Sequence, residues 1–236
     1  MPLRCLFHLH TKFSFDSYVS PSKIIAHARE NQVDVLVVTD HNTLRGALEV
    51  SKLAGGKPPY VIIAGEYKTE KGDIIGMFLK EEIQSRESNE VIREIKRQGG
   101  LAVLPHPYKG HRLDEILLSQ MDLIETFNAR CSAADNVLSD ELAQRLGKPP
   151  LAGCDAHCAA ELNAAVIEFA VEPPSNATEL RNVFLIAPRS IETRPVSKIY
   201  QVYSQMIKAG KTRDIMLFLY QVKRALLLIL KDRSIL

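Results

Sequence analysis

Two histidines near the start of the chain have the spacing of a pair that can bind one metal ion. His8 and His10 lie two residues apart at the end of a predicted strand, Leu3–Leu9. Because side chains alternate along a strand, both imidazoles are expected on the same side. An H-x-H pair alone is a weak signal, since such pairs also occur on surfaces and in cores. The pair therefore indicates a metal site only if further ligands join it.

Further ligand-type residues follow other predicted strands, in the segments T-D-H, A-G-E, L-P-H-P and G-C-D-A-H. In a parallel sheet the C-terminal ends of the strands lie on one face, where such folds place their active sites. One tetrahedral ion needs only about four ligands, so this larger set predicts two or three divalent ions that share carboxylates. Mixed imidazole and carboxylate donors suit Zn, Mn or Fe. The candidate ligands are His8, His10, Asp16, His41, Glu66, His106, Asp155 and His157, with Cys131 as a further candidate.

Short apolar runs alternate with amphipathic segments and would position these residues. Ser20-Pro21 is an N-cap followed by proline at the first helical position, and Gly147 ends a predicted helix from Ser132 to Leu146. This alternation predicts an α/β fold with a parallel sheet, either open or closed into a barrel. Two strand-like pieces meet across Glu70–Asp73 and predict a hairpin. The expected strands are Leu3–Leu9, Val33–Thr39, Tyr60–Ala64, Ile74–Leu79, Leu101–Leu104, Leu123–Phe127, Leu151–Gly153 and Ala165–Ala170.

Composition gives the chain room for one ordinary globular core. It has 236 residues, of which 46% are hydrophobic and 25% charged, with a net charge of +2 that offers no global reason to expect a nucleic-acid partner. Four cysteines without a secretory signal predict free thiols in the cytoplasm. Residues 195–236 carry eight basic and two acidic residues. We therefore place a soft boundary near Pro195, between a barrel domain at 1–194 and a basic, apolar helical extension at 195–236.

The extension is expected to form two helices. Ile199, Val202 and Met206 have helical spacing, and 215–230 is apolar nearly all round, so this second helix must be covered. We favour packing against the barrel or a partner subunit in a homodimer. A basic, apolar helix lying on an anionic membrane surface is the alternative. The apolar runs are too short to span a bilayer.

Six segments of the sequence together resemble the PHP (polymerase and histidinol phosphatase) superfamily of metal-dependent phosphoesterases. They are H-L-H-T-K-F-S-F-D-S from His8, V-T-D-H-N-T from Val38, A-G-E from Ala64, G-G-L-A-V-L-P-H-P from Gly99, I-E-T-F-N-A-R from Ile124 and A-G-C-D-A-H from Ala152. The resemblance covers about residues 3–170. It implies a distorted (β/α)7, TIM-like barrel with the metal site at the C-terminal ends of the strands.

The resemblance also implies how three ions would share the ligands. The first ion would bind His8, His10, Glu66 and Asp155. The second would share Glu66 and add His106 and a ligand after the fifth strand, for which Cys131, Asn128 or water are the candidates. The third would bind Asp16, His41 and His157. Family members often have an aspartate two residues before the first histidine, where this chain has Leu6, so a supporting acceptor is missing there.

We expect a metal-dependent phosphoric ester hydrolase that cleaves phosphate mono- or diesters of a small molecule or nucleotide with a metal-activated hydroxide. The residues expected to act in catalysis are Asp16, His41, Arg130 and His157. Arg130 would grip phosphate, with an ordinary surface salt bridge as its alternative. A PHP module that binds metal without catalysis is the second reading. A C–N hydrolase is the third, which we disfavour because Glu66 holds the bridging position that a carboxylated lysine often fills.

Overall fold

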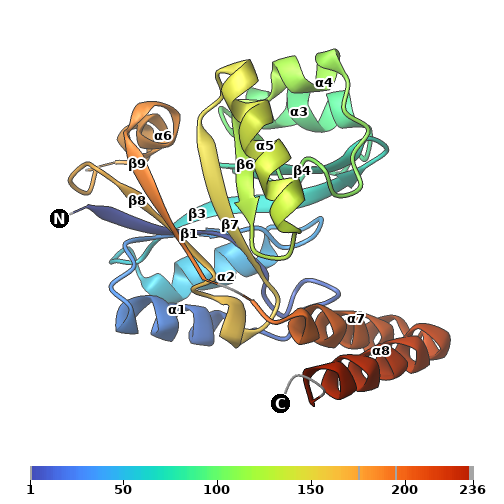
Figure 1. Cartoon of the computed structure of the whole chain (residues 1–236). Helices are drawn as coiled ribbons and strands as arrows, with labels where there is room; N and C mark the ends of the chain where they lie inside the picture. The colour runs from blue at the N-terminus through green and yellow to red at the C-terminus, as the bar shows by residue number, and fades with distance from the viewer. Residues whose placement is uncertain (1, 175, 195, 234–236) are drawn as a thin grey trace.

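The computed structural model describes residues 2–174, 176–194 and 196–233, so the predicted boundary at Pro195 lies outside the described residues. These described residues form nine strands and eight α-helices. Figure 1 shows how the elements are arranged in space. The strands are β1 (Leu3–Leu9), β2 (Val35–Val38), β3 (Tyr60–Thr69), β4 (Gly72–Met77), β5 (Leu101–Leu104), β6 (Leu123–Asn128), β7 (Pro150–Ala156), β8 (Ala165–Phe169) and β9 (Arg189–Thr193). The helices are α1 (Pro21–Glu30), α2 (Arg45–Ala54), α3 (Ser88–Arg97), α4 (Glu115–Gln120), α5 (Ala133–Leu146), α6 (Ala177–Ile186), α7 (Lys198–Thr212) and α8 (Ile215–Arg233).

Strands β1 to β7 form a closed barrel, because β1 pairs with both β2 and β7. The barrel strands are parallel except β4, which is antiparallel to β3 and β5 and completes the hairpin predicted at Glu70–Asp73. The barrel interior and the helix interfaces bury an apolar core that includes Leu6, Leu36 and Leu151. The structure thus confirms the seven-stranded α/β barrel and resolves the choice that periodicity left open.

The segment predicted as a last strand of the parallel sheet lies outside the barrel. β8 pairs antiparallel with the first half of β1, at Leu3–Cys5, and β9 pairs with β8 as an outer strand. The second half of the same edge of β1 pairs with β7, at Phe7 and Leu9. One strand edge therefore serves two neighbours in succession.

Local sequence signals explain where the main helices begin and end. Ser20 accepts a hydrogen bond from the backbone N–H of Lys23 at the start of α1. Ser132 and Asp135 form a capping box on α5, which ends at Gly147 with a left-handed φ of 61°. These predicted boundaries are confirmed. The sequence analysis missed the short helix α4 and the outer strand β9.

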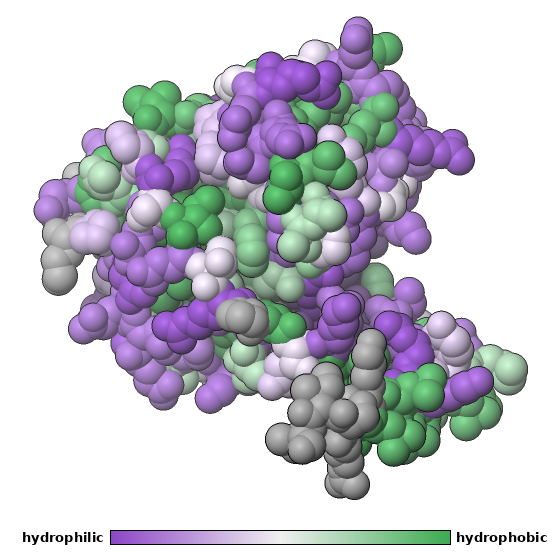
Figure 2. Space-filling view, in the orientation of Figure 1, coloured by the Kyte–Doolittle hydropathy of each residue, from purple (hydrophilic) through white to green (hydrophobic). Residues whose placement is uncertain are grey.

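The C-terminal extension forms the two expected helices, and α8 packs on α7 in a pair that projects from the barrel (Figure 1). Gln221 of α8 is buried. Hydrophobic side chains of the pair stay exposed, as Figure 2 shows, so the barrel does not supply the expected cover for α8. None of the helices in the described part of the chain is long and apolar enough to cross a membrane. The exposed apolar residues of α8 include Ile215, Met216, Leu219, Tyr220, Leu226, Leu227 and Leu230.

Candidate metal centre

The C-terminal ends of the parallel strands bring the predicted ligands into one cluster. Three groups of described side chains place their ligand atoms within 4.8 Å of one another. These groups are His10 with His41 and His157, His8 with Glu66 and His106, and His8 with His10 and Asp155. The centroids of the His8 and His106 rings are 5.7 Å apart, and those of His10 and His157 are 4.1 Å apart. Residues separated by more than a hundred positions thus meet at a single rim.

Glu66 lies at the centre of the cluster and contacts four imidazoles. Its Oε1 is 3.4 Å from Nε2 of His8 and 3.1 Å from Nε2 of His106. Its Oε2 is 3.5 Å from Nε2 of His10 and 3.0 Å from Nδ1 of His41. Each oxygen of the carboxylate therefore faces a different pair of histidines, which is the arrangement expected of a ligand shared between two ions.

Two aspartates extend the cluster on the His157 side. Oδ1 of Asp155 lies 3.8 Å from Nε2 of His8, 3.6 Å from Nε2 of His10 and 3.4 Å from Nδ1 of His157. Oδ2 of Asp16 lies 3.5 Å from Nε2 of His41 and 3.2 Å from Nε2 of His157. Asp16 belongs to the loop of residues 10–20 between β1 and α1, which we call the Asp16 loop. Eight of the nine candidate ligands thus each contact at least one other candidate ligand.

Backbone strain accompanies three of these residues. His8, His106 and Asp155 have φ values of 65°, 30° and 46°, in or near the left-handed region that is unfavourable for residues with a Cβ. The pairing of β1 with β2 and with β7 also shifts register around His8. Strained positions of this kind persist where the surrounding structure fixes them, and they gather at functional sites.

Glu125 supports the cluster from β6, and the sequence analysis did not single it out. Its Oε1 accepts a hydrogen bond from Nδ1 of His8 at 2.7 Å, and its Oε2 accepts one from the backbone N–H of His106 at 2.7 Å. Glu125 thus provides the supporting acceptor that is missing at the position of Leu6. The only signal in the sequence is an acidic residue inside an apolar strand, in L-I-E-T-F, whose side chain is fully buried in the structure.

Asp40 supports His10 through an intermediate hydroxyl. Its Oδ1 accepts hydrogen bonds from Oγ of Ser14 at 2.6 Å and from the backbone N–H of Thr11 at 2.7 Å. Oγ of Ser14 lies 3.1 Å from Nδ1 of His10. Asp40 therefore orients a neighbouring imidazole, with Ser14 as the link.

The residues after the fifth parallel strand are placed differently from the other candidates. The amide of Asn128 donates to Oε2 of Glu125 at 2.9 Å and to Oδ2 of Asp155 at 3.3 Å. Cys131 is in none of the ligand groups found among the described residues, and burial raises the pKa of its thiol to about 12. Its role as a ligand stays a prediction.

Arg130 is buried and paired, which differs from the open guanidinium expected to grip phosphate. Its Nε donates to Oε1 of Glu161 at 2.9 Å, and its Nη2 donates to the carbonyl oxygen of Tyr200 at 3.2 Å. Oε2 of Glu161 accepts from the backbone N–H of His157 at 2.9 Å. The side chain of Arg130 lines the pocket, but its observed contacts hold the His157 segment and α7 in place.

For most groups in the cluster, the charged neighbours together outweigh burial and set the direction of the pKa shift. Burial alone would lower the pKa of His8, but Glu125 and Glu66 raise it well above the usual 6.5. Burial would likewise lower the pKa of His41, and Glu66 raises it well above that value. Burial alone would raise the pKa of Glu66, but His8 and His41 hold it well below its usual value. Burial lowers the pKa of His10 well below 6.5, which keeps that imidazole neutral.

The donor set fits divalent cations. Five buried side-chain atoms of the cluster have no hydrogen-bond partner among the described residues, although the groups are polar or charged. Such atoms are costly unless another partner satisfies them, and a cation would do so. Imidazole nitrogens with carboxylate oxygens suit Zn, Mn or Fe. The five atoms are His8 Nε2, His10 Nε2, Asp16 Oδ1, Glu66 Oε2 and His106 Nδ1.

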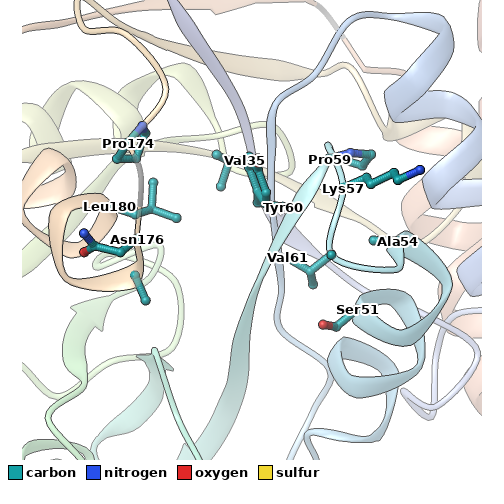
Figure 3. A pocket seen from close by; sticks show the side chains of 12 residues that line it. Val35, Ser51, Ala54, Lys57, Pro59, Tyr60, Val61, Pro174, Asn176 and Leu180 are labelled. Carbon is teal, nitrogen blue, oxygen red and sulfur yellow. The ribbon is translucent and has the colours of Figure 1, made fainter.

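A pocket of about 210 Å³ opens above the cluster. Its walls include cationic side chains from three parts of the chain: Lys68, Lys109 and Lys208. Nζ of Lys109 lies 3.6 Å from Oδ2 of Asp155. A separate cavity of about 270 Å³ has Val35, Tyr60 and Leu180 in its walls (Figure 3). Val35 and Tyr60 are the first residues of β2 and β3, so this cavity lies at the opposite end of the barrel. The first pocket, and not the second, gives access to the candidate ligands.

Comparison with known proteins agrees with this geometry. The chain matches the family models described as PHP domain, over residues 7–72, and as PHP-associated, over residues 133–184. It is 36% identical over 158 residues to the uncharacterized protein MJ1587 of Methanocaldococcus jannaschii, a match that covers 59% of this chain and 91% of that protein.

Solved structures share the fold. A two-domain protein of Bacteroides vulgatus, described as containing a predicted PHP-like metal-dependent phosphoesterase, superposes with a TM-score of 0.65 at 16% identity, over 82% of this chain and 65% of that one. An amidohydrolase of Chromobacterium violaceum, with bound sulfate and no metal, superposes with a TM-score of 0.55 at 14% identity, over 65% of this chain and 87% of that one. With its sequence matches, its barrel and its histidine-rich rim, this chain belongs to the PHP family.

Proposed function

We propose that the protein is a metal-dependent phosphoesterase that hydrolyses phosphate mono- or diesters of a small molecule or nucleotide. The observation that carries the proposal is the position of Glu66 among four imidazoles, together with buried ligand-type atoms that have no hydrogen-bond partner among the described residues. A site meant only for packing would not gather charged groups whose polar atoms stay unsatisfied.

The ligands divide into groups around the shared carboxylate. His8, His10, Glu66 and Asp155 would hold one ion, and His106 with Glu66 would hold another. Asp16, His41 and His157 would hold a third, with Zn, Mn or Fe as the candidate metals. When bound, such ions supply Lewis acidity, which lowers the pKa of an attacking water and neutralises charge on phosphoryl oxygens.

The remaining residues of the chain orient these ligands and shape access to them. Glu125 fixes the ring of His8 by accepting from Nδ1, so that Nε2 faces the cluster. Phe15 stacks on the His41 ring with a centroid distance of 4.6 Å and shields one face of it from solvent. Lys109 adds positive charge beside Asp155. Arg130, through Glu161, holds the segment that carries His157.

The alternatives make different predictions. A module that binds ions without catalysis would bind metal and turn over no ester. A C–N hydrolase, the activity class named for the similar protein of Chromobacterium violaceum, would cleave amides or amidines instead. We favour ester hydrolysis because a glutamate, rather than a lysine, contacts four of the imidazoles.

The test is turnover of p-nitrophenyl phosphate and bis-p-nitrophenyl phosphate by protein loaded with Mn or Zn, with metal content measured by elemental analysis. We expect ester cleavage that chelation abolishes and that Glu66→Gln lowers together with metal content. A phosphate-release screen of nucleotides and sugar phosphates would then identify the substrate class. Metal-loaded protein that cleaves neither ester nor any compound of the screen would contradict the proposal and favour the accessory module.

A further inference from the structure

Helix α7 lies against the metal pocket, although it falls outside both segments that match the family models. Nε2 of Gln201 donates to the carbonyl oxygen of Arg130 at 2.8 Å. About one and two turns further along the helix, Gln205 and Lys208 line the pocket itself. The extension therefore contributes side chains to the mouth of the site and is more than a neighbour of the barrel.

Lys208 is held at this mouth by an aromatic ring. Its Nζ lies 5.1 Å from the centroid of the Phe15 ring, and the same ring stacks on His41 with an interplanar angle of 13°. A cation on an aromatic face is favourable and restricts the flexible lysine side chain in advance of binding. One ring thus links the ammonium group to a candidate ligand of the cluster.

The ammonium of Lys208 is free to bind an anion. Among the residues that the structure describes, it forms no ion pair, whereas Lys109 lies near Asp155 and Arg130 is paired with Glu161. Lys208 is also only half-buried, so it can reach a ligand in the pocket. It is therefore better suited than Arg130 to contact a phosphate group.

The charge of the metal-loaded site also favours a phosphate group. Four carboxylates line the pocket, so two divalent ions would neutralise them and three would leave a positive charge. They belong to Asp16, Glu66, Asp73 and Asp155. A phosphate monoester carries a charge of about −1.5 to −2 near pH 7, because its second pKa is about 6. A diester carries a single negative charge and has no third terminal oxygen. A cation at the mouth, added to the ions at the floor, therefore favours the monoester.

We propose that Lys208 of α7 binds a terminal phosphoryl oxygen of the substrate, and that this contact directs the site toward phosphate monoesters. The inference rests on the proposed function and narrows it. Lys208 is a binding residue in this scheme, since it contacts the phosphate, while Phe15 positions it. The helical extension is then part of the active site.

The experiment compares three variants with the parent protein, all loaded with Mn. Lys208→Met keeps the aliphatic stem on Phe15 and removes the charge, Lys208→Arg keeps the charge, and Lys223→Met is the control on the exposed surface of α8. We expect Lys208→Met to raise KM for p-nitrophenyl phosphate roughly tenfold with little change in kcat, as loss of one charged hydrogen bond would. For bis-p-nitrophenyl phosphate the rise should be smaller. Lys208→Arg should recover most of the affinity that Lys208→Met loses, and Lys223→Met should stay near the parent.

A binding measurement keeps this inference separate from the proposed function. Calorimetric titration of the Mn-loaded proteins with inorganic phosphate should show roughly tenfold weaker binding for Lys208→Met. If the parent cleaves no ester, the proposed function fails, and this titration alone decides the role of Lys208. Equal phosphate affinity in Lys208→Met and the parent, or an equal rise in KM for both esters, would overturn the inference.

Discussion

Oε1 of Glu125 lies 2.7 Å from Nδ1 of His8, and the two side chains meet across a strand that separates their own. Glu125 is on β6 and His8 on β1, with β7 between them. Gly153 of β7 lies next to both side chains. A Cβ added there would lie 1.7 Å from Oε1 of Glu125 and 3.0 Å from Cβ of His8. The hydrogen bond that orients His8 therefore depends on the absence of a side chain at position 153.

Gly153→Ala should lower both stability and metal affinity. The added methyl group must displace Glu125, and crowding of a packed interior costs about 1–3 kcal/mol. Urea unfolding measures the loss of stability, and titration with Mn against a chelator measures the loss of affinity. Gly210→Ala is the control, because a Cβ at this position of α7 meets nothing within 4 Å and alanine favours a helix. Equal stability of the two variants would refute the steric argument.

Glu125→Gln should weaken metal binding while leaving the barrel folded. The amide keeps the size of the side chain but removes the charge that pairs with His8. Loss of such a supporting partner typically costs about 10–100-fold in metal affinity. Metal titration followed by circular dichroism checks both parts of the prediction. Glu141→Gln, at an exposed position of α5, should bind metal like the parent protein.

Metal binding should weaken as the pH falls. The pKa values of His8 and His41 are raised well above 6.5 by their carboxylate neighbours, so protons compete with a cation for these rings. Binding then releases protons, and calorimetry in buffers of different ionisation enthalpy detects them. An affinity for Mn that does not change between pH 6 and pH 8 would show that these rings are not ligands.

Without metal, the same raised pKa values predict the opposite slope for stability. A histidine whose pKa is raised by folding stabilises the folded state below its unfolded pKa of about 6.5, and this contribution is lost as the pH rises through the folded value. Thermal unfolding in excess chelator should therefore show a contribution from His8 and His41 that fades at alkaline pH. In His8→Ala this fading should be smaller.

Lys211→Met should loosen the Asp16 loop. Nζ of Lys211 donates to the carbonyl oxygens of Lys12, Ser14 and Ser17 at 2.9, 2.7 and 2.7 Å. Removing these hydrogen bonds should cost about 1–3 kcal/mol and expose the loop to proteolysis. Limited digestion mapped by mass spectrometry tests this, with Lys223→Met as the control. An unchanged digestion pattern at residues 10–20 would contradict the role given to Lys211.

Most of the candidate ligands could be predicted from the sequence, because they close strands in recognisable segments. The side-chain types alone identify these candidates, and the order of the strands matters little for finding them. They include His8, His10, Glu66 and Asp155. Glu125 could not be found in the same way. Its contact with His8 requires that β7 lie between the two strands and that Gly153 leave the space open, which only the closed barrel shows.

The outer elements escaped prediction for another reason. β9 reads R-S-I-E-T and pairs with β8 alone, so it lacks the apolar alternation of a buried strand. α4 has six residues, too few for a helical period to emerge. The contacts of Lys208 and Lys211 could not be predicted either, because nothing in the local sequence of α7 indicates that the helix returns to the Asp16 loop.

The division of one edge of β1 between β7 and β8 has a consequence for biosynthesis. Strand β1 has to wait for the partners of that edge until residues beyond 150 have been translated. Such distant pairings form slowly, and the waiting strand is rich in apolar side chains that favour aggregation. We therefore expect nascent chains that stop before β7 to require a chaperone. Chains that extend through β8 should no longer require it.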